Sequence, residues 1–135
     1  MKATLLLADA VTAHEDGTFT VLRGGINLTT GQGQGPFLFN GGMLVRLIFA
    51  KTELGRHDVM VTCVNDKGEA CTDHFSRSVV VTEQRRVFSL CVAIMMAIPQ
   101  VGRYKFVLSV DGRPVEEWPL EARSVGAKVG LEVTK

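Results

Sequence analysis

The glycine-rich segment at residues 31–36, with the sequence GQGQGP, is the nearest approach to a phosphate-binding loop in this chain. Closely spaced glycines let backbone N–H groups approach an anion. However, no Lys followed by Ser or Thr comes after this segment, and Pro36 lacks the N–H group that a phosphate site would use. We therefore interpret the segment as a loop or a bent strand edge, and we expect no nucleotide or other cofactor.

The histidines and serines do not form a catalytic or metal-binding pattern. None of the three histidines belongs to an HxH or HExxH motif, so we expect surface positions for them and no metal site. Asp73 and His74, with Ser76 or Ser78, supply the residue types of a hydrolytic triad. Neighbouring residues of a strand point to opposite faces, so Asp73 and His74 cannot form a proton relay. The three histidines are His14, His57 and His74.

The three cysteines, Cys63, Cys71 and Cys91, are odd in number and include no CxxC pair. This pattern indicates free thiols in a reducing compartment. Cys91 lies in an apolar run, where loss of solvation raises the pKa of a thiol and weakens it as a nucleophile. No motif brings together a nucleophile, a base and a stabilising group, and we expect the chain not to be an enzyme.

The composition indicates one globular domain. The chain has 135 residues, of which 46% are hydrophobic and 21% are charged, and this excludes a disordered chain. The formal net charge of +1 is too small to attract nucleic acid or an anionic membrane. The apolar residues 5–8 are interrupted by Asp9, so we expect no signal peptide. The longest apolar run, residues 87–98, is too short to span a bilayer.

Short runs rich in β-branched and aromatic residues, separated by turn residues, predict an all-β chain. Residues 4–11 and 18–22 flank a turn at residues 14–17 and predict an N-terminal hairpin. Residues 26–40, between two glycine pairs, are expected to form a loose region. Four apolar residues then share one face of a strand, while Arg46 lies on the other face between apolar neighbours, so we expect another surface to cover part of that face. The four apolar residues are Met43, Val45, Leu47 and Phe49.

A second hairpin is predicted from residues 57–65 and 69–75. Its turn at residues 66–68 suits a three-residue loop that ends on a left-handed glycine. This register places Cys63 opposite Cys71 on one face. Both a disulfide and two free thiols are compatible with that placement, and the reducing context favours free thiols.

Further strands are predicted in the C-terminal half, beginning with a short one at residues 79–82. Residues 87–98 are apolar on both faces, which favours a central strand, with a helix as the alternative. Residues 104–110 alternate and lead into an Asp-Gly turn at 111–112, which predicts a third hairpin. Two prolines place its return strand at a sheet edge. These prolines are Pro114 and Pro119, and the residues expected in the core are Tyr104, Phe106, Leu108, Val110, Trp118 and Leu120.

Several short strands joined by turns, without crossover helices, predict an antiparallel two-sheet β-sandwich of immunoglobulin-like or jelly-roll-like type. We expect a single domain at residues 1–123, followed by a C-terminal extension or arm at residues 124–135. The extension alternates apolar and polar residues, so it is either the last strand of its own sandwich or an arm that pairs with a neighbouring subunit. We favour the arm, and its expected interaction residues are Val125, Val129, Leu131 and Val133.

Three stretches of sequence suggest a relationship to known proteins. They are LLLADA at residues 5–10 with DGTFTVLRGG at 16–25, residues 59–68, and GRYKF at 102–106 with the following DG at 111–112. Together they resemble a family of small uncharacterised β-sandwich proteins of bacteria and tailed phages. The resemblance extends from residue 5 to about residue 120 and implies a β-sandwich without a catalytic signature. The chain departs from the family pattern because it lacks a proline-rich segment before the last hairpin and continues through residues 124–135.

These observations lead to two hypotheses about function. The first is a non-catalytic interaction module that docks on a larger protein assembly, for example as a phage virion structural or capsid-decoration protein. Its partners would be that assembly or further copies of the chain in a homo-oligomer, in the virion if a phage encodes it and in the cytoplasm otherwise. The alternative is an intracellular bacterial module that binds a small ligand or has a regulatory role.

Overall fold

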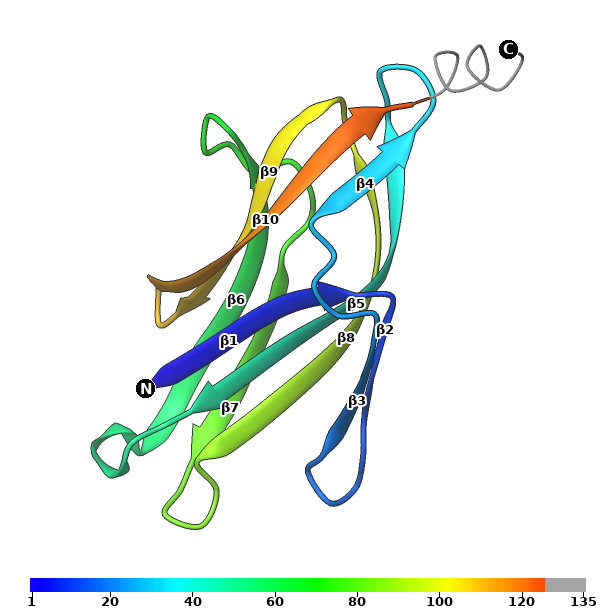
Figure 1. Ribbon diagram of the computed structural model, residues 1–135. Helices are drawn as coiled ribbons and strands as arrows, with labels where there is room; N and C mark the ends of the chain where they lie inside the picture. Colours follow the sequence, from blue (N-terminus) through cyan, green and yellow to red (C-terminus); the bar gives the residue numbers. More distant parts are fainter. Residues whose placement is uncertain (126–135) are drawn as a thin grey trace.

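Strands make up almost all of the regular structure in residues 1–125, the part of the chain that the computed structural model describes (Figure 1). A short 3₁₀ turn, η1 at Lys51–Glu53, interrupts them. The prediction of an all-β chain is confirmed. Among the described residues, no helix is long and apolar enough to cross a membrane. The strands are β1 Lys2–Ala8, β2 Ala10–Ala13, β3 Phe19–Leu22, β4 Leu28–Gly31, β5 Phe37–Ile48, β6 Gly55–Asn65, β7 Phe75–Val81, β8 Val87–Ile98, β9 Gly102–Val110 and β10 Arg113–Ser124.

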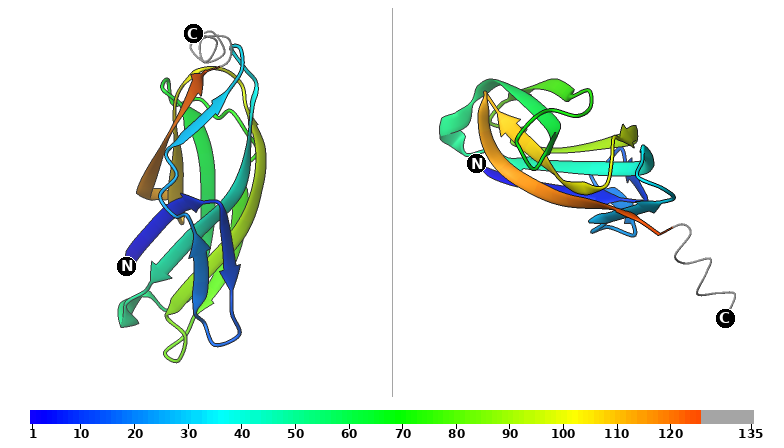
Figure 2. Two further views of the ribbon diagram at one scale, coloured as in Figure 1. Left: turned by 45° about the vertical axis from the view of Figure 1, so that its right-hand side comes forward. Right: turned by 90° about the horizontal axis from the view of Figure 1, so that it is seen from above.

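Two layers of strands form a sandwich, as Figure 2 shows. One sheet has the strand order β1-β5-β8, and the other has the order β4-β10-β9-β6-β7. Neighbouring strands are antiparallel, with the exception of the parallel pair β4 and β10. The two-sheet prediction is therefore confirmed, and one of the two sheets is mixed because β4 joins it in parallel.

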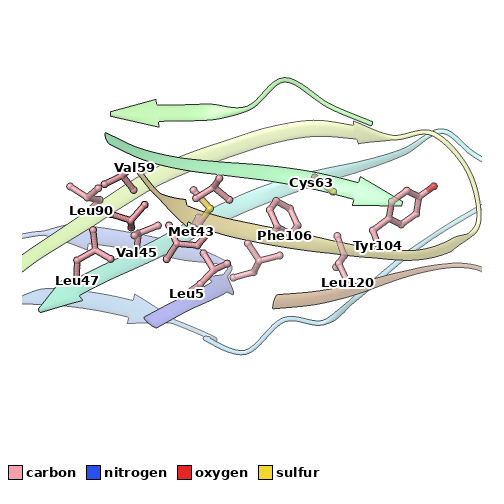
Figure 3. Close-up of a cluster of buried hydrophobic side chains, with 14 of the residues drawn as sticks. Leu5, Met43, Val45, Leu47, Val59, Cys63, Leu90, Tyr104, Phe106 and Leu120 are labelled. Carbon is pink, nitrogen blue, oxygen red and sulfur yellow. The ribbon is translucent and has the colours of Figure 1, made fainter. Parts of the chain in front are cut away.

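The core lies between the sheets and contains the alternate, inward-facing residues of both (Figure 3). Tyr104, Phe106, Leu108 and Val110 of β9 are all buried, as predicted. On β10, Leu120 is buried and Trp118 is partly buried, and the Trp118 indole N–H donates to the carbonyl oxygen of Ile26 at 2.7 Å. The same inward alternation buries Met43, Val45 and Leu47 of β5, and Phe49, which follows the end of β5, is buried as well.

The hairpin of β2 and β3 covers part of the outer face of the three-stranded sheet. Leu44, which points outward from β5, is only 2% exposed, and the Arg46 guanidinium lies 5.6 Å from the centre of the Phe19 ring. At Gly42 an added Cβ would lie 2.8 Å from the backbone nitrogen of Val11, so the close approach of β2 to β5 requires glycine there. A covered second face around Arg46 was predicted and is confirmed.

The first predicted strand is divided in two by the fold. β1 pairs with β5, whereas β2 pairs with β3, and Asp9 lies between them with its N–H donating to the carbonyl oxygen of Leu22. The N-terminal hairpin is present, but residues 4–11 are not one strand. The division falls at Asp9, the charged residue that interrupts the apolar run.

The prediction of a loose region at residues 26–40 is wrong. β4 lies within it, and β5 begins at Phe37 and continues through Gly41 and Gly42. Phe37 and Phe39 are buried, which anchors this part of β5 despite its glycines. β4 has the sequence LTTG, which lacks an apolar alternation, and it is held by its parallel pairing with the end of β10.

The predicted turn at residues 66–68 is confirmed. Gly68 has a φ of +80°, its N–H donates to the carbonyl oxygen of Asn65, and the N–H of Asn65 donates to the carbonyl oxygen of Glu69. The predicted return strand at residues 69–75 does not form, however. The chain pairs with β6 at Ala70 by an isolated bridge and then leaves the ladder until β7 begins at Phe75.

The prolines of β10 lie where the sequence predicted them, along an exposed sheet edge. β4 pairs only with residues 121–124, so Pro114 and Pro119 lie in the part of β10 that has β9 on one side and no described strand on the other. At residues 87–98 the chain forms strand β8 and not a helix, but β8 is the edge strand of its sheet and not a central one. The prediction of a central strand is therefore wrong.

Candidate functional site

A groove of about 800 Å³ opens between the two sheets on the side where β7 and β8 are the edge strands. One wall is formed by residues 92–97 of β8 and the other by residues 70–75, which lead into β7. Core side chains, including Met43, Cys63 and Phe106, form its floor. The groove exists because the chain leaves the ladder after Cys71, whose N–H still donates to Cys63, and rejoins it only at Phe75.

The inward face of β8 changes character along the groove. Phe88, Leu90 and Ile98 are buried, whereas residues 92, 94 and 96 on the same face are only partly buried. All six point toward the interior by strand alternation. The middle three, Val92, Ile94 and Met96, line the groove. Apolar side chains are therefore accessible from the groove at a spacing of two residues.

The free edge of β8 lacks the charged residues and prolines that protect many sheet edges. Among the described strands β8 pairs with β5 alone, and no other described backbone hydrogen bond involves its twelve residues. The strand has the sequence VFSLCVAIMMAI, without a charged residue or a proline. Natural edge strands are commonly shortened, charged or interrupted, because their unpaired N–H and C=O groups attract other strands. β8 is long, uncharged and open, as an edge that receives another strand would be.

The outer face of β8 is also apolar beside the groove. Ala93, Met95 and Ala97 are exposed there, and the Met95 side chain is 71% exposed. On the neighbouring strand Leu38, which lies opposite Ala97, is 65% exposed. Both faces of this half of β8 thus present apolar side chains to solvent.

Two thiols lie side by side at the groove, as the register predicted. The Sγ atoms of Cys63 and Cys71 are 3.6 Å apart, the Cys71 N–H donates to the carbonyl oxygen of Cys63, and neither residue forms a disulfide. Burial raises the pKa of the Cys63 thiol far above its ordinary value, and the neighbouring Cys71 adds to the rise. Cys63 is therefore a weak nucleophile in the folded protein.

The remaining candidate residues are dispersed. Asp73 and His74 line the groove. His14 lies in the β2–β3 hairpin, where its Nε2 shares a hydrogen bond with the hydroxyl group of Thr20. Burial raises the pKa of Cys91, as the apolar run predicted. Within residues 1–125, no three His, Cys, Asp or Glu side chains are close enough to hold a metal ion.

His57 differs from the surface position that the sequence predicted. Its ring is 16% exposed and stacks on Phe49, with 4.8 Å between the ring centres. Nδ1 lies 2.6 Å from a carboxylate oxygen of Asp111, and Nε2 lies 2.7 Å from the carbonyl oxygen of Glu53. Hydrogen bonds to Asp111 and then to Glu53 raise the pKa of His57. The residue is structural and lies outside the groove.

The predicted interaction residues fall almost entirely beyond the part of the chain that the structure describes. Val125 is 37% exposed, and its N–H donates to the carbonyl oxygen of Gly31 beside the end of β10. Val129, Leu131 and Val133 lie outside the described residues.

A family profile of unknown function matches residues 3–123, which covers all ten described strands except Lys2 of β1 and Ser124 of β10. The chain belongs to this family, DUF6941. Membership confirms the expectation of an uncharacterised domain. No curated protein and no solved structure matches the chain. The groove and β8 lie within the DUF6941 match, whereas residues 124–135 lie outside it.

Sequence reasoning missed the groove, although one signal for it was present. Twelve consecutive residues without a charge were interpreted as a strand enclosed on both sides. The same pattern is expected of an edge that receives a partner strand, and only the strand order separates the two cases.

Proposed function

We propose that this domain is a non-catalytic interaction module that binds an extended segment of a protein along the β8 edge. The observation that carries the proposal is the combination of an unprotected strand edge and a groove beside it. An added strand would use the free backbone groups of β8 for affinity, and its alternate side chains would enter the groove and supply specificity. The lining residues Val92, Ile94 and Met96 would contact apolar side chains of that segment.

Docking on a larger assembly follows from this mode of binding, since an assembly subunit with an extended segment would supply the added strand. A virion or capsid-decoration role is a narrower form of the same proposal. Co-sedimentation of the protein with a purified particle is the measurement that addresses it.

The general proposal can be tested with a display library of random ten-residue peptides, selected on the full-length protein. We expect the selected peptides to alternate apolar and polar residues and to lose binding when N-methyl groups block one of their edges. Ile94→Lys places a charge at the groove and should weaken binding at least tenfold. Val80→Lys, at a 60% exposed residue of β7 outside the groove, is the matched control and should bind normally.

Selected peptides that lack alternation, or that bind Ile94→Lys as well as the unsubstituted protein, would contradict the proposal. Thermal unfolding of both variants shows whether a loss of binding reflects a loss of the fold.

A small apolar ligand is the second candidate occupant, because the groove volume of about 800 Å³ lies within the range of ligand pockets, about 300 to 1,000 Å³. Such a ligand would leave the backbone groups of β8 unpaired, and for this reason we favour the peptide. Amide hydrogen exchange along β8 distinguishes the two functions. A bound peptide would slow this exchange, whereas a small ligand would compete with the selected peptides without slowing it.

A further inference from the structure

We infer that the occupant of the groove is the segment at residues 126–135 of a second copy of this chain. The inference rests on the proposed function, since it names the partner of the same edge. It has three supports: the side-chain pattern of the segment, its charges, and the position of the last described residue, Val125.

The side-chain patterns of the segment and the groove correspond. Val129, Leu131 and Val133 place three apolar side chains on one face of an extended chain. Along the groove, β8 presents three inward side chains at the same spacing, at residues 92, 94 and 96. Each stretch spans five residues, or about 13 Å of strand. A strand added in register would therefore bring three apolar side chains into the groove beside those of β8.

The other face of the segment is polar. Lys128, Glu132 and Thr134 alternate with the apolar residues and would point away from the groove toward solvent. β8 contains no charged residue, so neither Lys128 nor Glu132 meets a like charge on it. The alternative occupant is strand β8 of a second copy. That strand fits less well than the C-terminal segment, because its inward side chains already pack against the core of the molecule to which it belongs.

The position of Val125 favours a second copy over the same molecule. β10 is separated from β7, on the groove side, by β9 and β6. The chain leaves the domain next to β4, where the Val125 N–H donates to Gly31. Seen from above, the end of β10 lies on the far side of the molecule from the green loop at residues 66–74 (Figure 2, right). The last described residue therefore lies toward the β4 edge of its sheet, opposite the β7 edge that borders the groove.

The test is hydrogen exchange of the full-length protein, followed by mass spectrometry of a peptide that covers residues 92–97. We expect exchange there to slow at least tenfold between dilute and concentrated protein, in parallel with an increase in sedimentation mass. Leu131→Asp should abolish both changes, because it places a carboxylate in an apolar groove. Thr134→Asp, on the polar face of the same segment, should leave both unchanged. Ile94→Lys should reproduce the effect of Leu131→Asp from the groove side.

Several outcomes would overturn the inference. Protection of residues 92–97 that does not depend on concentration would assign the segment to its own molecule. Association that persists in Leu131→Asp would assign the contact to another surface. Fast exchange at all concentrations would show that the edge is not paired with the segment. In each of these cases, peptides from the library that still bind along β8 would show that the proposed function holds although the C-terminal segment is not the partner.

Discussion

His57 joins three parts of the chain at one end of the sandwich. Its two ring nitrogens both face acceptor oxygens, one on Asp111 and one on the backbone of Glu53. A neutral imidazole has only one N–H, so the two contacts are both satisfied only by the protonated ring. This explains why the pKa of His57 is raised although burial opposes the charge. The ring thereby holds the β9–β10 turn against η1.

This contact predicts a pH-dependent stability. Because the pKa of His57 is higher in the folded chain, its contribution is complete below about pH 6.5, the unfolded value, and decreases as the pH rises through the folded pKa. Asp111 has the opposite pH dependence. Its pKa is lowered, first by the hydrogen bond from the N–H of Asp58 and then by His57, so its contribution to stability is lost only as the pH falls into strong acid. Urea unfolding of the protein and of His57→Gln should differ more at pH 5.5 than at pH 8.5. An equal difference at both values would contradict this account.

Phe106 provides a second prediction at the level of single residues. Its ring is 4% exposed and belongs both to the core and to the floor of the groove. Phe106→Ala should lower the free energy of unfolding by about 3 to 5 kcal/mol, because it removes a buried ring and leaves a cavity. Leu38→Ala, at an exposed residue of β5, is the control and should change it by less than about 0.5 kcal/mol. A chemical denaturation curve that is the same for both variants would show that the core tolerates the cavity.

At the level of elements, the β2–β3 hairpin depends on one glycine for its close packing. An added Cβ at Gly42 would meet backbone atoms of Val11 and Ala10, which cannot rotate away as a side chain can. Gly42→Ala should therefore displace the hairpin and cost about 1 to 3 kcal/mol of stability. Faster proteolysis within residues 10–22 would report the displacement. Ala97→Val enlarges an exposed residue of the same sheet and should alter neither measurement.

The elements that the sequence predicted correctly are those with local signals. The turns at Gly68 and at Asp111–Gly112 require left-handed backbone, and both positions have a positive φ. β4 was missed because LTTG has no apolar alternation and forms through its pairing with residues 121–124. β8 was recognised as a strand but misplaced in its sheet, since strand order is decided by contacts distant in sequence. The groove was missed for the same reason, as it arises where residues 72–74 leave β6.

At the level of the whole molecule, residues 26–31 are joined to the second sheet by contacts with residues 118–124, about ninety positions later in the sequence. Leu28 of β4 pairs with Glu121 of β10, and the single tryptophan, Trp118, donates its indole N–H to Ile26. A β-sandwich with many contacts so distant in sequence folds slowly, in about milliseconds to seconds. We expect the contact between Trp118 and Ile26 to form after the rate-limiting step. Trp118→Phe should therefore speed unfolding and leave the folding rate nearly unchanged. Stopped-flow circular dichroism measures both rates, and a slowed folding limb would place this contact in the rate-limiting step.

The strand order also has a consequence for synthesis on the ribosome. All three strands of the β1-β5-β8 sheet are complete once residue 98 has been made. In the folded protein the other sheet covers the apolar inner face of these strands. When residue 98 has just been made, that sheet still lacks β9, which lies between β6 and β10. The part of this face that packs against β9 and β10, together with the uncharged edge of β8, therefore stays uncovered until residues 102–124 have emerged. Exposed apolar surface and an unpaired strand edge of this kind make incompletely folded chains prone to aggregate.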